Sequence, residues 1–141
     1  MFFQRDDAHV GSSRWGWSEG WHVAGLGQDR RAIPQYPDNR MCISTIVLTE
    51  LLHGAARSAR PDHNRHEVDR FAARLEILPF DVGAANHVAD IRANLERRGQ
   101  MIGGYDLLTA GHARSRGLIV VTGNLDEFNR VEGLRCEDWL G

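Results

Sequence analysis

The sequence predicts a three-layer α/β/α domain, in which helices cover both faces of a short parallel sheet. Two observations carry this prediction. Short apolar runs such as residues 118–121 alternate with longer segments whose apolar residues recur with helical spacing. Residues that cap or end helices, among them Asp81 and Gly117, stand between these segments. Alternating helices and short strands are typical of parallel sheets, and 141 residues suffice for one such domain.

Residues 1–40 differ from the rest of the chain. Glycines interrupt this segment, and Trp15, Trp17 and Trp21 crowd together without a steady period. We therefore divide the chain into an atypical Gly- and Trp-rich segment at residues 1–40, expected to be flexible, and a regular domain at residues 41–141. A partner-binding patch formed by the tryptophans is the alternative interpretation of the first segment.

Each element of the regular domain follows from local signals. Ser44 or Thr45 can cap the first helix, and Pro61 breaks the chain after it. Asp81 caps a later helix that ends at Gly99. The expected elements, in order, are a strand at 42–44, helices at 45–52 and 63–76, a strand at 77–80, helices at 82–99 and 106–116, a strand at 118–121, a turn at 126–128 and an extended piece at 134–137.

Composition and charge argue against several classes of protein. A net charge of −2 disfavours a protein held on nucleic acid by bulk electrostatics, although an acidic metal site can offset a basic face. The apolar runs are too short to span a bilayer and no secretory signal is visible, so we expect a cytoplasmic protein without membrane contact. Cys42 and Cys136 form no close pair, which disfavours a disulfide framework and a zinc site.

Polar residues of two segments are expected to meet at one edge of the sheet. Asp106 opens a helix after two glycines, while Thr122 and Asn124 follow the strand 118–121. In parallel α/β sheets, the carboxyl ends of strands and the adjacent helix starts face one crevice. Oxygen ligands suit Mg²⁺ or Mn²⁺, and such ions activate water and neutralise charge on a phosphodiester. The sequence therefore predicts an acidic metal site.

Each candidate also has a purely structural explanation. Glu50 can be a solvated carboxylate at the edge of its helix stripe, and Asp106 a helix-start carboxylate favoured by the macrodipole. Glu127 can belong to a solvated turn that Asn124 helps to form. His112 is a weaker candidate for lining the same site. The joint pattern favours the site over these separate explanations.

The order and spacing of several motifs are shared with a known family. The motifs are Met41–Thr45, Thr49–Gly54, Ala59–Arg65, Leu78–Asp81, Ile91–Ala93, Gly103–Asp106, Ala110–Leu118 and Glu137–Trp139. Together they resemble the PIN-domain toxins of the VapC type, and most closely the subgroup described as tRNA(fMet)-specific endonucleases. The resemblance covers roughly residues 40–140 and implies a PIN-like α/β fold.

The resemblance implies a role for each candidate residue. In that family, acidic residues hold Mg²⁺ and support hydrolysis of RNA phosphodiester bonds. By position, Glu50 would be the helix-borne catalytic acid and a metal ligand, and Asp106 a direct metal ligand. Glu127 matches the catalytic acid of the following turn. Thr122 and Asn124 match the polar strand end that helps to bind the cofactor.

The resemblance also implies partners. A toxin of a type II toxin–antitoxin system has a small antitoxin of the VapB type, whose C-terminal arm covers the acidic groove. The implied substrate is RNA, with initiator tRNA as the candidate, and the implied cofactor is Mg²⁺, with Mn²⁺ as a substitute. Family members commonly dimerise, so the likeness extends to a homodimer. Arg114 and Arg116 could hold the RNA backbone or lie solvated at the helix end.

The sequence departs from the family at its start. The family begins with an apolar strand that runs into Leu-Asp-Thr-Asn, whose Asp is a principal metal ligand. The corresponding place in this chain, near Arg14-Trp15-Gly16, has no carboxylate, and Asp6 or Asp7 is a weak substitute. A shifted reading frame, a misplaced start or the degradation of a family member would explain the difference. We therefore expect the first, central strand to be missing or altered, which would leave its neighbours' apolar faces uncovered.

Three functions remain for comparison. The first is a Mg²⁺-dependent endoribonuclease, impaired by the lost ligand. The second is a catalytically inactive PIN-like module that still binds antitoxin or RNA. A phosphatase-like or receiver-like domain ranks last. It needs a nucleophilic Asp at the end of the first strand, and the sequence offers none there.

Overall fold

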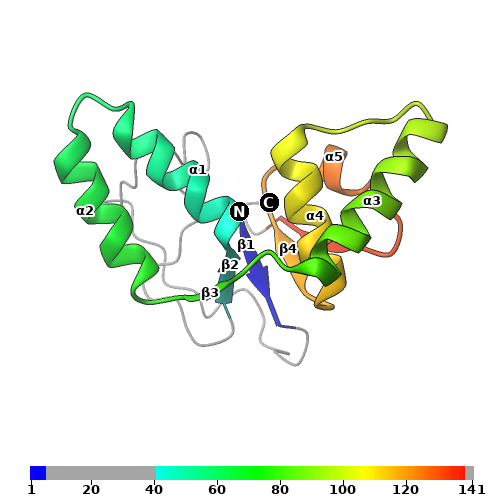
Figure 1. Ribbon diagram of the computed structural model, residues 1–141, viewed down its shortest axis with the longest axis horizontal. Coiled ribbons are helices and arrows are strands. Elements are labelled where there is room, and N and C mark those ends of the chain that lie inside the picture. Colours follow the sequence, from blue (N-terminus) through cyan, green and yellow to red (C-terminus); the bar gives the residue numbers. More distant parts are fainter. Residues whose placement is uncertain (6–40, 139–141) are drawn as a thin grey trace.

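A mixed five-stranded sheet with the order β3-β2-β1-β4-β5 forms the middle layer of the protein (Figure 1). This computed structural model describes residues 1–5 and 41–138. The strands are β1 (Phe2–Gln4), β2 (Met41–Ser44), β3 (Glu76–Leu78), β4 (Ile119–Val121) and β5 (Arg135–Glu137). The helices are α1 (Thr45–Ala56), α2 (Pro61–Ala72), α3 (Val82–Arg97), α4 (Gly104–Ser115) and α5 (Leu125–Phe128).

The predicted alternation of helices and strands is confirmed, with shifted boundaries. Ser44 caps α1 by accepting a hydrogen bond from the Ile46 amide at 3.0 Å, and Asp81 caps α3 through the Ala84 amide at 2.9 Å. Pro61 does not only break the chain. It opens α2, because the first helical position needs no amide donor and suits the fixed φ of proline.

The centre of the sheet is filled by β1, which runs in the reverse direction. Phe3 pairs with Cys42 on one side and with Val120 on the other, and both pairings are antiparallel. The pairs β2–β3 and β4–β5 are parallel, so the other four strands share one direction, as predicted. The first strand is therefore altered, and the expectation that its neighbours stay uncovered is wrong. A strand of three residues, Phe2–Gln4, is too short to show the alternation by which a strand is predicted from sequence.

Phe2 and Phe3 anchor two hydrophobic cores on opposite faces of the sheet. Phe2 packs on the α1–α2 side, where its ring centroid lies 5.8 Å from that of Phe71. Phe3, fully buried, packs on the α3–α4 side with Leu95. Neighbouring strand residues point to opposite faces, so this short strand serves both cores. Figure 1 shows the resulting layers, with α1 and α2 on one side of the strands and α3 and α4 on the other.

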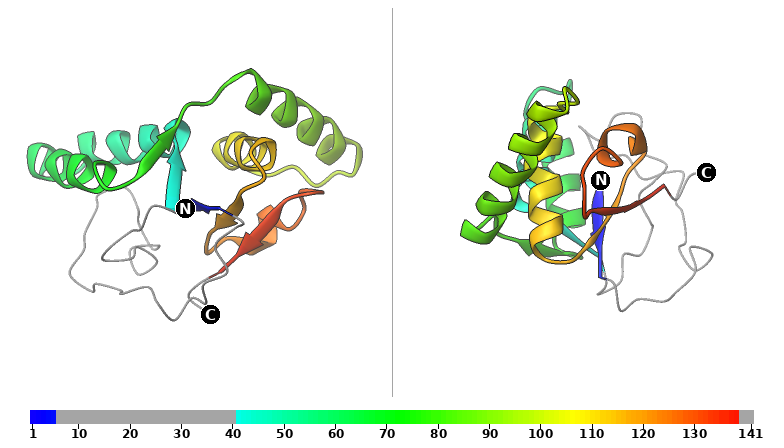
Figure 2. Two further views of the ribbon diagram at one scale, coloured as in Figure 1. Left: turned by 90° about the horizontal axis from the view of Figure 1, so that it is seen from below. Right: turned by 90° about the vertical axis from the view of Figure 1, so that its right-hand side faces the viewer.

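The two views of Figure 2 show α3 and α4 lying side by side, and Gly111 is what lets them approach. A Cβ atom added at Gly111 would lie 2.3 Å from Val88 Cγ2 and 2.8 Å from the Val88 amide nitrogen. We expect Gly111→Ala to lower the free energy of unfolding by about 1–3 kcal/mol, because backbone atoms cannot rotate away. Urea denaturation measures this change.

Gly104→Ala is the matched control for this prediction. It lies in the same helix, but an added Cβ would meet nothing within 4 Å. We expect this variant to be at least as stable as the original chain. Equal stability of the Gly111 variant would contradict the close packing of α3 on α4.

The predictions for the N-terminal segment concern residues outside the described part. The expected flexibility, the tryptophan patch and the substitute acids Asp6 and Asp7 all lie within residues 6–40. In the described residues, no helix has the length and apolar character needed to cross a membrane.

Candidate active site

The carboxyl ends of β2 and β4 lie at one edge of the sheet, where α1 and α4 begin. Glu50 lies on α1, Asp106 in the first turn of α4 and Glu127 in α5, which follows β4. The chain therefore delivers three carboxyl groups to this edge from three separate segments.

Asp106 and Glu127 are in direct contact. Their carboxyl groups share a hydrogen bond, and both lie beside Gly103. A Cβ atom at Gly103 would be 3.6 Å from Asp106 Oδ2 and 4.0 Å from Glu127 Oε2, so this glycine leaves room for the pair. The sequence predicted that Asp106 meets the end of the strand 118–121, and the family resemblance added Glu127 from the turn that follows it; the structure brings Asp106 and Glu127 together.

Asn124 and Thr122 hold the loop that carries Glu127. The Asn124 side-chain amide donates to Glu127 Oε2 at 3.0 Å, and the Asn124 backbone amide donates to Thr122 Oγ1 at 3.0 Å. Thr122 is buried, and its own amide donates to the Glu137 carbonyl at 3.0 Å. Asn124 thus contacts the acidic pair directly, while Thr122 fixes the loop beneath it.

The environment of the pair favours one retained proton. Burial raises the pKa of Asp106 from 3.8 to about 7, and the hydrogen bond and charge of Glu127 and the charge of Glu50 add to the rise. The hydrogen bond from Asp106 lowers the pKa of Glu127. Glu50 is exposed, yet desolvation by nearby protein still raises the pKa of its carboxyl. The pair therefore holds one proton more readily than separate carboxyl groups would, and Asp106 is the carboxyl whose pKa is raised.

The donor set suits a lightly coordinated Mg²⁺. Among residues 1–5 and 41–138, no three His, Cys, Asp or Glu side chains form a group that could hold a metal. Mg²⁺ usually retains several waters and binds proteins through only one or two carboxylates. The Asp106–Glu127 pair fits that mode, and a divalent cation would replace the shared proton. Glu50 lies near enough to add charge.

Comparison with known proteins settles the family. The sequence profile of the PIN domain matches residues 22–134. The chain belongs to the PIN-domain family. It is 54% identical over 101 residues to the tRNA(fMet)-specific endonuclease VapC of Salmonella typhimurium, covering 72% of this chain and 76% of that protein. It is 50% identical over 100 residues to the protein of the same name from Shigella flexneri, covering 71% of this chain and 76% of that one.

The structural comparison agrees with the sequence comparison. The crystal structure of DNA-bound VapBC from Salmonella typhimurium matches with a TM-score of 0.68 and 53% identity, over 70% of this chain and 74% of that chain. Within the PIN-domain family, the chain is therefore one of the VapC proteins. The resemblance and the α/β fold class expected from the sequence are confirmed.

In this VapC-family chain the amino end of the central strand β1, and not its carboxyl end, lies at the acidic edge. Phe2 of β1 pairs with Val121 at the carboxyl end of β4. The opposite end of the segment, Arg5, forms an ion pair with Glu76 at the start of β3, on the far edge of the sheet. Residues 1–5 therefore place no carboxylate at the site.

His112 does not line the acidic site. Its ring is fully buried between the rings of Phe3 and Phe80, with centroid distances of 5.7 and 5.6 Å. Its Nδ1 lies 2.7 Å from the Oγ of Ser44, the residue that caps α1. Burial lowers the pKa of His112, so the ring is neutral and ties α4 to the start of α1.

The two arginines considered for RNA binding face the other end of α4. Arg114 donates to Asp90 Oδ2 at 2.7 Å and to the Glu132 carbonyl at 2.9 Å, which holds α4 against α3. Arg116 lies 3.9 Å from Asp81. Both are about 12 Å or more along the helix from Asp106, which favours a structural role.

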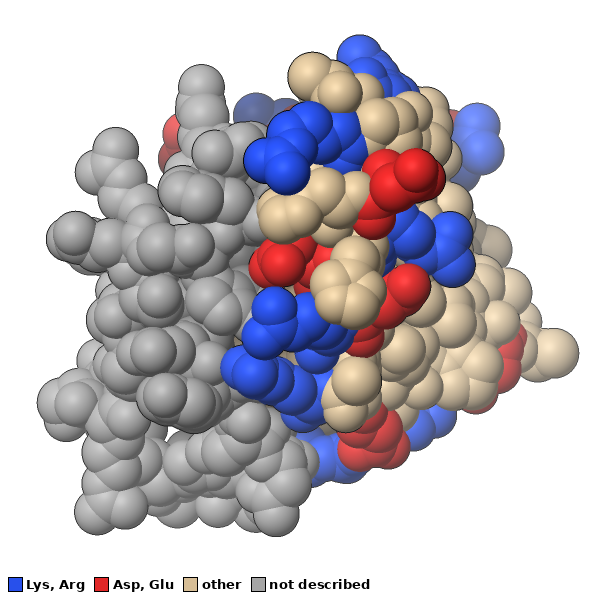
Figure 3. All heavy atoms as spheres, turned by 90° about the vertical axis from the view of Figure 1, so that its left-hand side faces the viewer, with Lys and Arg blue, Asp and Glu red and all other residues tan. Residues whose placement is uncertain are grey.

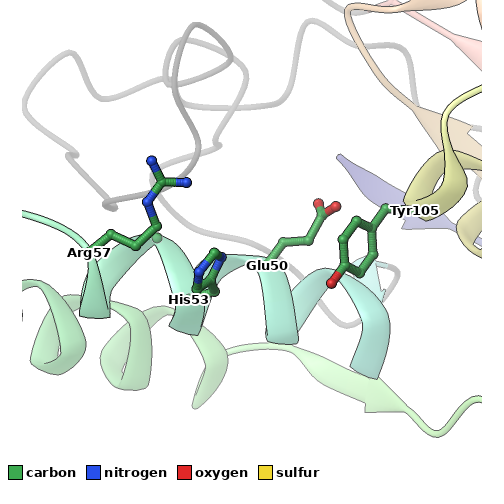
Figure 4. A pocket seen from close by; sticks show the side chains of 5 residues that line it. Glu50, His53, Arg57 and Tyr105 are labelled. Atoms are coloured by element: carbon green, nitrogen blue, oxygen red, sulfur yellow. The ribbon is translucent and has the colours of Figure 1, made fainter.

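A surface pocket lies beside Glu50 that was not predicted from the sequence. It is lined by Glu50, His53, Gly54, Arg57 and Tyr105, and its volume is about 530 Å³ (Figure 4). The helical spacing of Glu50, His53 and Arg57 could have revealed their shared face. The contribution of Tyr105 from α4 could not be read from local spacing.

Proposed function

We propose that this VapC-family chain is a Mg²⁺-dependent endoribonuclease, the toxin of a toxin–antitoxin pair, with strongly reduced activity. The observation that carries this proposal is the hydrogen-bonded Asp106–Glu127 pair at the carboxyl edge of the sheet, with Glu50 nearby. The names of the relatives support it, since they are called endonuclease or ribonuclease VapC.

The residues of the site divide the work. Asp106 and Glu127 would hold Mg²⁺, or Mn²⁺ in its place, while Asn124 keeps the Glu127 carboxylate oriented. The bound ion would supply charge neutralisation at the scissile phosphate and a more acidic water. Glu50, exposed and close to the pair, would accept a proton from the attacking water and would contribute to metal binding, as the family resemblance implies. Thr122 would keep the loop rigid from below.

The reversed strand supports the proposed impairment. In the family pattern the first strand ends in an Asp at the metal, whereas here the same edge receives the Phe2 end of β1. A site with one carboxylate fewer binds Mg²⁺ more weakly and leaves more of the phosphate charge unbalanced. The raised pKa of Asp106 adds a proton that must be displaced before the cation binds.

The partners of the proposed function follow from the relatives. The solved neighbours are VapBC complexes, which supports a VapB-type antitoxin for this chain. Two relatives are named tRNA(fMet)-specific, which supports RNA, and initiator tRNA in particular, as the substrate. A cytoplasmic location and a homodimer are consistent with these partners.

The second candidate is an inactive module that retains antitoxin or RNA binding. The absence of a three-ligand group within the described ranges 1–5 and 41–138 is the observation that favours it. Binding without cleavage would then be the remaining property of the chain.

A cleavage assay separates the two candidates. We expect the purified chain to cut transcribed initiator tRNA in Mg²⁺, but at least about 100-fold more slowly than the Salmonella typhimurium relative assayed beside it. EDTA should abolish the cleavage, and Mn²⁺ should restore it. Rates equal to those of the relative would refute the impairment. Cleavage no faster than in EDTA, with antitoxin still bound in a pull-down, would establish the inactive module.

A further inference from the structure

The pocket beside Glu50 places an aromatic ring and a cation next to the acidic pair. Glu50 and His53 lie on successive turns of α1 and Arg57 is its C-terminal cap, so the three side chains project from one face of the helix. Figure 4 shows the Glu50 carboxylate and the Arg57 guanidinium on the same side of α1, with the Tyr105 ring beside Glu50. Tyr105 adjoins Asp106 in α4, which ties this pocket to the acidic site.

Tyr105 has the properties of a stacking platform. Tyr105 is 53% exposed, so the face of its ring is accessible to a ligand. Nucleic-acid bases stack on exposed aromatic rings, whatever their identity. A base beside the scissile phosphate would reach this ring, because Tyr105 lines the same pocket as Glu50, whose charge acts on Asp106.

Arg57 has the properties of a phosphate contact. It is exposed at the far end of the pocket, seven residues and therefore about 10 Å along α1 from Glu50. That separation prevents it from neutralising the acidic pair and leaves its guanidinium available to a neighbouring phosphate of the same strand. Guanidinium groups bind phosphate oxygens in a bidentate manner.

The neighbouring surface on α2 carries charges of both signs, several of them paired. Blue and red side chains are interspersed over the described part of the face in Figure 3. On α2, Arg65 lies 3.1 Å from Asp69 and Arg70 lies 3.6 Å from Glu67, so these cations are paired. With a net charge of −2, the chain offers little general attraction for RNA. Individual contacts such as those of Tyr105 and Arg57 would then contribute more to substrate binding than the general charge of the chain.

We infer that Tyr105 and Arg57 are substrate-binding residues, with the Tyr105 ring stacked on a base beside the scissile phosphate and the Arg57 guanidinium bound to an adjacent phosphate. This inference rests on the proposed ribonuclease function, because it takes the acidic pair as the place of the scissile phosphate. It adds two contacts for the RNA that do not take part in bond cleavage.

Binding of a fluorescein-labelled, unpaired RNA oligonucleotide in EDTA tests the inference without cleavage. We expect Tyr105→Ala and Arg57→Ala each to raise the Kd about tenfold, while Tyr105→Phe stays within about twofold of the original chain, because phenylalanine retains the stacking face. Arg92→Ala removes one positive charge from α3, where Arg92 pairs with Glu96 at 2.9 Å, and should leave the Kd within about twofold.

The outcomes separate the pocket from the chemistry. Equal Kd values for Tyr105→Ala and the original chain would overturn the stacking contact. An Arg92→Ala effect as large as that of Arg57→Ala would reduce the phosphate contact to general charge. Loss of antitoxin binding with unchanged RNA binding would make the pocket a protein subsite and overturn the inference. Absence of metal-dependent cleavage, with the expected Kd changes, would refute the proposed ribonuclease but leave the two RNA contacts established.

Discussion

Replacing Phe3 with alanine is expected to lower the free energy of unfolding by about 3–5 kcal/mol. Phe3 is fully buried at the centre of the sheet, where it packs against the α3–α4 core and the ring of His112. It lies outside the residues matched by the family profile, which begin at residue 22. A large loss of stability would therefore show that a segment foreign to the family pattern has become part of the core.

Tyr105→Ala is the matched control, because it removes an aromatic ring that is 53% exposed. We expect it to change the free energy of unfolding by less than about 0.5 kcal/mol. Urea denaturation followed by circular dichroism measures both variants. If Phe3→Ala were as stable as Tyr105→Ala, residues 2–4 could not be filling the central position of the sheet.

Asp106→Asn is expected to remove all metal-dependent cleavage that the chain retains. The amide keeps the size of the carboxyl group and can still donate to Glu127, but it cannot supply the negative charge that a divalent cation requires. We expect a loss of about 100-fold or more, down to the rate in EDTA. Asp126→Asn, which alters an exposed carboxylate in α5 next to Glu127, is the control and should cleave like the original chain. Cleavage by the Asp106 variant at the original rate would exclude this residue as a metal ligand.

The same variant is expected to stabilise the metal-free protein at alkaline pH. A carboxyl whose pKa rises on folding, here to about 7, stabilises the fold below its unfolded pKa of 3.8 and loses that contribution as pH rises through 7. Partial exposure and the opposite shift of the Glu127 pKa reduce the effect. In EDTA at pH 8, we expect Asp106→Asn to be about 1–2 kcal/mol more stable than the original chain, and the difference to shrink towards pH 4. A variant that is less stable at pH 8 would contradict the shared proton.

The elements with local signals could be predicted from the sequence. The α3 cap at Asp81 and the strand before Thr122 involve residues that are close together in the chain. β1 could not be predicted in the same way, because its stability comes from partners far away in sequence. Phe3 pairs with Cys42 and Val120, and no periodic pattern within residues 2–4 predicts either contact.

The candidate site likewise has features that could be predicted from the sequence and features that depend on packing. Asp106 was predicted to meet Thr122 and Asn124, since helix starts and strand ends converge at one edge of such sheets, whereas Glu127 entered only through the family resemblance. The distribution of protons between Asp106 and Glu127 depends on burial and on their mutual hydrogen bond, which only the structure reveals. The pocket was missed because Arg57 and Tyr105 come from different helices whose relative placement is a property of packing.

The reversed strand β1 occupies the middle of the sheet, so a second strand cannot be placed between β2 and β4 while β1 is there. A first strand that ends in an Asp at the acidic edge, as in the family pattern, would have to run parallel to β2 and β4, and it would need the same hydrogen-bonding groups that β1 already uses. The carboxyl end of β1 lies at the opposite end of the strands, where Arg5 pairs with Glu76. Restoring the family's first strand therefore means replacing β1 by another segment. That replacement would also remove Phe2 from one hydrophobic core and Phe3 from the other.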